Sequence, residues 1–321
     1  MKTEQNTTSY VKELTNTLEE GIAELFESDR YRKYLTTMSK FHHYSINNSI
    51  LIALQKPEAT LVAGYRAWEV KFGRHVKKGE KAIRIFSPMK FQSKEKQEDL
   101  SNEIDKPNEE SEDTLRVIRT GFRTAGVFDI SQTEGKALPS IGVTSLTGTA
   151  EGCEELTSEL IALSPVPVMF TEITGDANGY FSSEEQLIVV KDSLSEIHRL
   201  KTLIHEISHA KLHSNIDELT IDRQTMEVEA ESIAYVVSQS FGIDTSEYSF
   251  GYIAAWSSGR EMKELKMSLE TIRITASGMI DELNERLGIK EQIENPTIES
   301  ETGVVPKQEK NRKISDERAV R

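Results

Sequence analysis

The sequence predicts an α+β protein with two domains, on the evidence of its element order and its length. Helices and strands follow one another in blocks, whereas a doubly wound sheet needs regular alternation. A chain of 321 residues is more typical of two domains than of one. Hydrophobic residues make up 37% of the chain, below the usual share, so we expect folded cores together with disordered segments.

The first domain is expected to span residues 1–140. Apolar residues at helical spacing predict a helix over 6–28, with its stripe formed by Leu14, Leu18, Ile22 and Leu25. The same kind of pattern predicts the other elements of this domain, namely a helix over 45–55, strands over 60–63 and 82–87, a helix near 65–73, and a strand-like segment after Leu115.

Three segments lack the composition of a core. Residues 93–113 hold nine acids and three lysines, which predicts a flexible, solvated insertion over about 91–114. Residues 131–150 are rich in Gly, Ser, Thr and Pro, which is typical of a linker. Residues 291–321 are polar without periodicity, so we expect a disordered tail.

The second domain is expected over 151–290. Its predicted elements are a helix over 153–163, strands over 166–172 and 185–191 joined by a turn at 175–179, and helices over 194–213 and 224–241. Ser193 and Glu196 form a plausible capping box for the first of these two long helices. Gly242 is a good residue to end the second.

Cysteine content and hydropathy exclude several classes of protein. Cys153 is the single cysteine, so the chain can form no intramolecular disulfide and no Cys-rich zinc site. The longest pure aliphatic run, 50–54, is far too short to cross a bilayer, and we expect no membrane partner. The first residues lack the apolar centre of a signal peptide, so a cytoplasmic location is expected.

Charge is distributed unevenly along the chain. The net charge of −14 argues, taken whole, against a nucleic-acid partner, because phosphates repel acidic proteins. Residues 30–90, however, hold thirteen lysines and arginines against three acids, a net charge of +10. The argument from total charge therefore fails within this block.

The basic block interleaves cations with aromatic residues, a combination suited to single-stranded DNA, in which cations follow the backbone and rings stack on bases. The candidate DNA-binding residues are Tyr44, Asn47, Tyr65, Arg66, Trp68, Arg74, Lys77, Lys78 and Lys81. The alternative is that the aromatic residues belong to the core and the lysines to a solvated hairpin. His42, His43 and His75 lie in the same region but have no metal-ligand spacing to a partner.

The sequence His205-Glu206-Ile207-Ser208-His209 is the sharpest chemical signal. Two histidines four residues apart lie on one helix face, so both imidazoles can reach one zinc ion. Glu206 projects beside that position and can take a proton from a zinc-bound water. The alternative is a chance occurrence of a short motif, which the predicted amphipathic helix makes weaker.

A third protein ligand is needed, because catalytic zinc usually has three and one open position. Glu227 and Glu231 share a face of the next predicted helix, whereas Glu229 points away. An acidic helix start would look the same, because acids favour the first turn. His213 continues the histidine stripe and could touch the site, and the strand over 185–191 could pair with an extended peptide.

Two parts of the chain resemble known families. The string YSINNSILIALQKPEATLVAGYRAWEVKFGRHVKKGEKAI, with VFDISQTEG at 127–135, resembles the N-terminal domain of ArdC-like antirestriction proteins and LtrC-like proteins of conjugative elements. HEISHAKLH followed by EVEAESIAYVV resembles the ImmA/IrrE-like zinc metallopeptidases. The stretch between His209 and Glu227 is short for that family, and the 93–113 insertion interrupts the first domain.

The resemblance implies a single-stranded-DNA-binding domain joined to a gluzincin-type domain. It implies zinc ligands at His205 and His209 with Glu206 as general acid and base. The third ligand in the family precedes an alanine by three positions; that alanine is Ala230 here, which selects Glu227 and leaves Glu231 second.

Three functions remain open from the sequence. The first is a DNA-binding antirestriction protein of a mobile element that is also a zinc peptidase with an unidentified protein or peptide substrate. The second is a DNA-protecting binder whose zinc site is structural. The third is a regulatory protease that cleaves a repressor of a mobile element.

Overall fold

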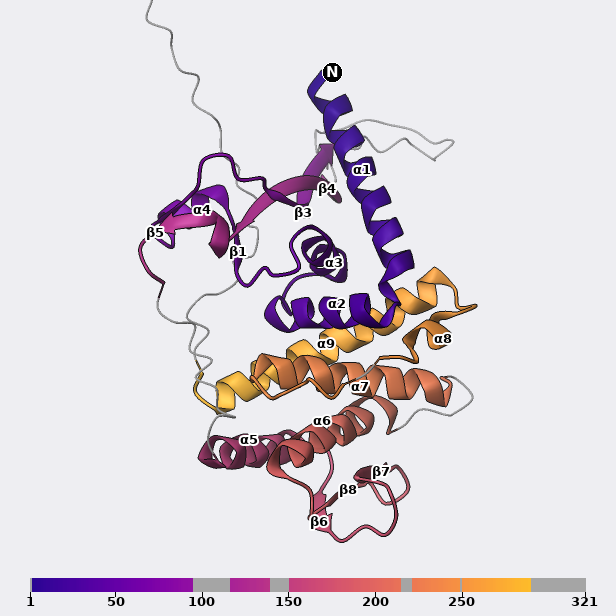
Figure 1. The fold of residues 1–321 in the computed structure, drawn as a ribbon. Helices are drawn as coiled ribbons and strands as arrows, with labels where there is room; N and C mark the ends of the chain where they lie inside the picture. Colours follow the sequence, from indigo (N-terminus) through magenta and orange to yellow (C-terminus); the bar gives the residue numbers. More distant parts are fainter. Residues whose placement is uncertain (1, 95–115, 139–149, 215–220, 249, 290–321) are drawn as a thin grey trace, which may run out of the picture.

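The protein is a mixed helix and sheet structure in two domains, seen in a computed structural model that describes residues 2–94, 116–138, 150–214, 221–248 and 250–289 (Figure 1). The expected acidic insertion lies outside the described residues except at its start, and the expected tail lies wholly outside them.

The first domain begins with three helices and continues with small sheets. Its elements are α1 (Lys2–Leu25), α2 (Ser28–Lys40), α3 (Ile46–Gln55), β1 (Val62–Gly64), α4 (Tyr65–Val70), β2 (Arg74–Val76), β3 (Ile83–Lys94), β4 (Arg116–Asp129), the 3₁₀ turn η1 (Ile130–Gln132) and β5 (Thr133–Gly135). The order β1-β4-β3 forms one antiparallel sheet, and β2 pairs with β5 in a separate ribbon.

Asn48 joins α3 to the long β3–β4 hairpin. Its amide nitrogen donates to the Phe86 carbonyl and its amide oxygen accepts from the Phe86 N–H, both at 2.9 Å. This pairing mimics one step of a β-ladder, so a helix side chain fixes the register of the hairpin against the helices.

In the second domain a three-stranded sheet packs on helix α6, and further helices pack behind α6 (Figure 1). Its elements are α5 (Ala150–Leu163), β6 (Val168–Thr171), β7 (Gly179–Ser182), β8 (Leu187–Lys191), α6 (Glu196–His213), α7 (Arg223–Ser240), α8 (Ile253–Ser257) and α9 (Met262–Arg286). β8 lies at the centre of the sheet, parallel to β6 and antiparallel to β7.

One hydrophobic core runs through both domains. Ile22 and Ile50 of the first domain and Ile233 of the second belong to a single buried cluster. α2 lies between α3 and the α7–α9 layer (Figure 1). Two hydroxyl pairs cross this junction: Tyr31 Oη lies 2.8 Å from Ser232 Oγ, and Thr36 Oγ1 lies 2.8 Å from Tyr235 Oη. The N-terminal helices therefore pack directly on α7.

Several sequence predictions differ from the structure in detail. The helix predicted over 6–28 is α1, which ends at Leu25, and α2 was not predicted; Glu27 adopts an extended conformation between the two helices. β5 lies within the segment predicted as a linker, and β7 occupies part of the predicted link between β6 and β8. β3 continues to Lys94, so the first residues of the predicted insertion are strand.

Candidate metal centre

Helix α6 brings His205 and His209 to one side of the second domain. It begins at Ser195, whose hydroxyl accepts from the His198 N–H, rather than at the predicted Ser193. Leu200, Leu203, Ile204 and Ile207 of α6 are fully buried in the core. The opposite stripe is left for His205 and His209, whose Nε2 atoms lie 3.1 Å apart.

Glu227 completes a cluster of three donor atoms. Its Oε2 lies 3.5 Å from His205 Nε2 and 3.8 Å from His209 Nε2. All three donor atoms lie within 4.8 Å of one another. Zinc–ligand bonds of about 2.0–2.2 Å in a tetrahedron separate neighbouring ligand atoms by about 3.3–3.5 Å. These residues therefore fit a zinc ion with a fourth position left open.

The start of α7 is fixed, and this fixes Glu227. Asp222 caps the helix by accepting from the Thr225 N–H at 3.0 Å, and Arg260 donates to the same carboxylate at 2.8 Å. The Trp256 indole N–H donates to Thr225 Oγ1 at 3.0 Å. Glu227 stands one turn beyond this anchored end.

Opposite charges within the cluster shift its protonation. The hydrogen bond from His205 and the neighbouring imidazole of His209 hold the pKa of Glu227 far below its ordinary value. Burial lowers the pKa of His205, but the hydrogen bond to Glu227 and the neighbouring carboxylates outweigh it and raise that pKa. Burial is the first cause of the lowered pKa of His209. A neutral His209 beside an ionised Glu227 is the protonation state that a divalent metal requires.

Glu206 is buried beside the cluster. Glu206 is 7% exposed, and this burial raises the pKa of its carboxyl to about 7. The charge of Glu227 also raises this pKa, whereas His205 and the Phe181 N–H of β7 lower it. A carboxyl whose pKa lies near neutrality can both accept and return a proton.

Glu231 and Glu229 occupy different surroundings from Glu227. The Glu231 carboxylate accepts a hydrogen bond from the Tyr252 hydroxyl, and burial raises its pKa. Glu229 is buried, and its Oε2 lies 3.4 Å from His213 Nε2. His213 Nδ1 in turn lies 3.0 Å from His209 Nδ1.

A chain of contacts therefore runs from Glu229 through His213 to His209. Because a carboxylate can only accept, His213 Nε2 carries the proton and His213 Nδ1 accepts from His209 Nδ1–H. This tautomer leaves the lone pair of His209 Nε2 directed at the cluster. The sequence offered His213 as a residue within reach of the site but gave Glu229 no role.

A cleft of about 380 Å³ lies beside Glu206 and His205. Asn178 and Gly179 at the start of β7 form part of its wall. A Cβ atom at Gly179 would lie 2.6 Å from Thr202 Cγ2 and 2.9 Å from the Val189 carbonyl oxygen, so the close packing of β7 on α6 requires glycine here.

The prediction that the strand over 185–191 could pair with an extended peptide is wrong. The segment 185–191 contains β8, which is paired on both sides by β6 and β7 and has no free edge. β7 pairs only with β8 among the described residues, and Gly179 at its start lines the cleft.

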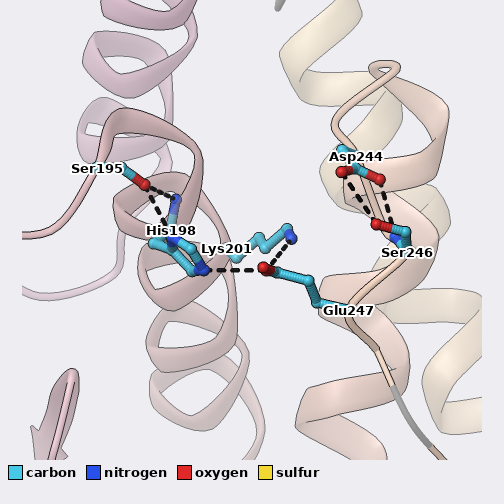
Figure 2. A network of polar contacts seen from close by, with 6 residues as sticks. All are labelled: Ser195, His198, Lys201, Asp244, Ser246 and Glu247. Atoms are coloured by element: carbon cyan, nitrogen blue, oxygen red, sulfur yellow. Dashed lines mark hydrogen bonds and ion pairs between the residues drawn. The ribbon is translucent and has the colours of Figure 1, made fainter.

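A polar network (Figure 2) includes three residues that line the cleft, His198, Lys201 and Glu247. His198 Nε2 lies 2.9 Å and Lys201 Nζ 3.3 Å from Glu247 Oε2, and Ser195 Oγ lies 2.7 Å from His198 Nδ1. Lys201 lowers the pKa of Glu247, with a smaller contribution from His198. His198, which the sequence gave no part in the site, therefore forms its rim.

The candidate DNA-binding residues separate into three groups. Those exposed on the region of α4, β2 and the turn after β2 are Tyr65, Arg66, Lys77, Lys78 and Lys81. Tyr44 and Asn47 line a second cavity, of about 620 Å³, beside the β3–β4 hairpin.

The side chains of Trp68 and Arg74 are engaged by other parts of the protein. Trp68 is fully buried, and its indole N–H donates to the Phe128 carbonyl at 2.8 Å, so neither ring face is open to a base. The Arg74 guanidinium donates hydrogen bonds to Thr133 Oγ1 and to the carbonyl oxygens of Thr133 and Lys136. The alternative interpretation of core aromatics applies to Trp68.

Comparison with known proteins defines both domains. Residues 164–293 match the IrrE N-terminal-like domain of the M78 peptidases, and residues 4–128 match the N-terminal domain of anti-restriction factor ArdC. The chain therefore combines an ArdC-type N-terminal domain with an IrrE-like domain, which confirms the resemblance to these two families.

An uncharacterized protein of Bacillus anthracis, pXO2-81, is 28% identical over 318 residues, covering 89% of this chain and 53% of that protein. The chain thus spans about half the length of this relative. The metal-free crystal structure of the antirestriction protein ArdC from plasmid R388 aligns with a TM-score of 0.48 and 16% identity, over 75% of this chain and 84% of that one. Among the described residues, no helix combines the length and apolarity needed to cross a membrane.

Proposed function

We propose that this protein is a zinc-dependent peptidase that also binds single-stranded DNA. The observation that carries the peptidase proposal is the convergence of His205, His209 and Glu227 beside the buried Glu206. Zinc bound by these ligands would lower the pKa of a water molecule towards neutrality and polarise a peptide carbonyl.

Glu206 is the proposed general base and acid. Its carboxylate takes a proton from the attacking water and returns it to the nitrogen of the departing amine.

The edge of β7 is the proposed binding surface for the peptide. An extended segment can add to a free strand edge through backbone hydrogen bonds, with little demand on its sequence. β7 begins at Gly179 on the wall of the cleft and donates from Phe181 to Glu206, so a peptide on this edge passes the proposed base.

The peptidase proposal is tested by two variants and a control. Glu206→Gln is expected to retain zinc and lose cleavage of a library of unstructured peptides, whereas His205→Ala is expected to lose zinc. Glu134→Gln, in an exposed carboxylate–histidine pair on the β2–β5 ribbon, is the matched control. Cleavage at the wild-type rate by Glu206→Gln would refute the assignment.

The DNA proposal rests on exposed cations beside an exposed ring. Arg66, Lys77, Lys78 and Lys81 are exposed, and Tyr65, which precedes Arg66 at the start of α4, is 57% exposed. The second cavity, which Tyr44 and Asn47 line, offers a second candidate contact.

Binding should be measured on the full chain, because the N-terminal helices share their core with α7. Affinity for a single strand should fall with salt, with a slope of about −0.7 for each phosphate contacted. The triple variant Lys77→Gln/Lys78→Gln/Lys81→Gln should reduce that slope, whereas neutralising the exposed Lys12, Lys211 and Lys263 should not. Binding that does not depend on salt would contradict the proposal.

We further propose that the DNA domain shields single-stranded DNA from restriction during transfer of a mobile element. The match of residues 4–128 to the anti-restriction factor domain supports this role. Protection of incoming DNA by Glu206→Gln would assign it to binding alone. Loss of protection in that variant would make cleavage, including cleavage of a repressor, part of the role.

A further inference from the structure

A second cluster of metal-ligating side chains lies where the two domains meet. His42 and His43 come from the connection between α2 and α3, and Asp281 comes from α9. The Nε2 atoms of His42 and His43 lie 3.3 and 3.5 Å from the same carboxylate oxygen, Asp281 Oδ1. The three donor atoms lie within 4.8 Å of one another.

The spacing suits metal ligands. Ligand atoms of one tetrahedral zinc lie about 3.3 Å apart, so separations of 3.3 and 3.5 Å are compatible with ligands of a single ion. The separations here match those between Glu227 and its two histidines, 3.5 and 3.8 Å, in a cluster of the same composition. Two imidazoles and one carboxylate favour zinc or a similar divalent transition metal over magnesium or calcium.

The surroundings orient the donors and leave one side open. Ser277 Oγ donates to the other carboxylate oxygen, Asp281 Oδ2, at 3.4 Å, which turns Oδ1 towards the histidines. The side chain of His42 is 7% exposed, whereas those of His43 and Asp281 are 38% and 46% exposed. A metal here would be held from the protein side and would keep a position open to water.

We propose that His42, His43 and Asp281 bind a second divalent transition-metal ion, of the zinc class, that links the two domains. The site uses none of the residues of the proposed catalytic centre and goes beyond the proposed function. Its ligands belong to the ArdC-type domain on one side and to the last helix of the IrrE-like domain on the other. Bound metal therefore stabilises the junction of the domains.

The test is zinc stoichiometry on the full chain, titrated to saturation after removal of metal by a chelator. Wild type is expected to bind two ions. His205→Ala/His209→Ala, which removes the first centre, is expected to bind one, and the addition of His43→Ala and Asp281→Asn should reduce this to none. Zinc should raise the Tm of the His205→Ala/His209→Ala variant and leave that of the quadruple variant unchanged.

The control for the second site is the exposed pair His75 and Glu134, 3.1 Å apart, which has no third ligand among the described residues. His75→Ala/Glu134→Gln in the His205→Ala/His209→Ala background should still bind one zinc. His43 and Asp281 are partly exposed, so their substitution should leave the circular dichroism spectrum unchanged. Zinc binding that is absent without the first centre, or that survives His43→Ala/Asp281→Asn, would overturn the proposal.

Discussion

Replacement of Glu229 tests whether residues outside the first coordination sphere control zinc binding. Glu229 reaches the proposed ligand His209 only through His213, at 3.4 and 3.0 Å. Glu229→Gln keeps an amide oxygen that can accept from His213 but removes the charge. Glu229→Leu removes the acceptor as well, which frees His213 and His209 to adopt the wrong tautomer.

Loss of such an outer partner typically weakens metal affinity about 10- to 100-fold. We therefore expect Glu229→Gln to weaken zinc binding about 10-fold and Glu229→Leu about 100-fold, or about 1.4 and 2.7 kcal/mol. Both side chains of the His213–Glu229 pair are only 5% exposed, so solvent offers little replacement for the lost contact.

The assay is competition for zinc against a chromophoric chelator at pH 7, in the His43→Ala/Asp281→Asn background so that one centre is measured. Circular dichroism of the metal-free variants verifies the fold. The exposed pair provides the control, because Glu134→Gln removes a carboxylate from a histidine that is far from the cluster in sequence. Wild-type affinity in Glu229→Leu would refute the reasoning.

Three further predictions concern the scaffold. Asp129 accepts from the backbone N–H groups of Thr60, Leu61 and Ser131, and these hydrogen bonds hold its pKa below the ordinary value despite burial. Asp129→Asn should cost about 2–4 kcal/mol in urea unfolding at pH 7, because one N–H group then faces an amide donor. Since the folded pKa is the lower one, this stabilisation is present above the unfolded pKa near 4 and is lost as pH falls through the folded value, so an unchanged gap at low pH would contradict it. Gly179→Ala should cost about 1–3 kcal/mol through contact with the Val189 carbonyl oxygen, whereas Gly278→Ala, in open space on α9, should be neutral or stabilising; equal effects would contradict the packing argument. Tyr31→Phe should destabilise the chain by about 1–2 kcal/mol by leaving Ser232 unpaired between the domains, and unaltered stability would show that the contact contributes nothing.

Local sequence patterns predicted the residues that lie together in the candidate metal centre. The spacing of His205 and His209 and the shared face of Glu227 and Glu231 are consequences of helical geometry within one or two turns. The choice between the two acids depends on how α7 meets α6 and on Tyr252, which are tertiary facts. The position of Glu229 opposite His213 depends on the same packing.

Strand order and burial could not be obtained in the same way. The segment 185–191 was correctly predicted as a strand, but a strand sequence does not reveal that β8 lies between two others. An aromatic residue such as Trp68 among cations is compatible with a DNA contact and with a place in the core. Only the fold shows that the Trp68 ring is buried. Helix α9 could have been found, since Leu265, Leu269, Ile272 and Ala276 recur at helical spacing and are buried.

The second histidine cluster shows a further limit of spacing arguments. The carboxylate that completes this cluster, Asp281, lies in α9 and is far from His42 and His43 in sequence. Metal sites assembled from distant segments leave no local motif, so the sequence analysis gave these histidines no role.

The most direct test of the central claim compares Glu227→Gln with Glu231→Gln for zinc affinity in the His43→Ala/Asp281→Asn background. The two carboxylates lie one turn apart on the same face of α7, so the variants differ little in charge or in helix propensity. A metal centre formed by His205, His209 and Glu227 requires that Glu227→Gln lose high-affinity zinc binding and that Glu231→Gln keep it. Zinc retained by Glu227→Gln and lost by Glu231→Gln would contradict the proposed centre.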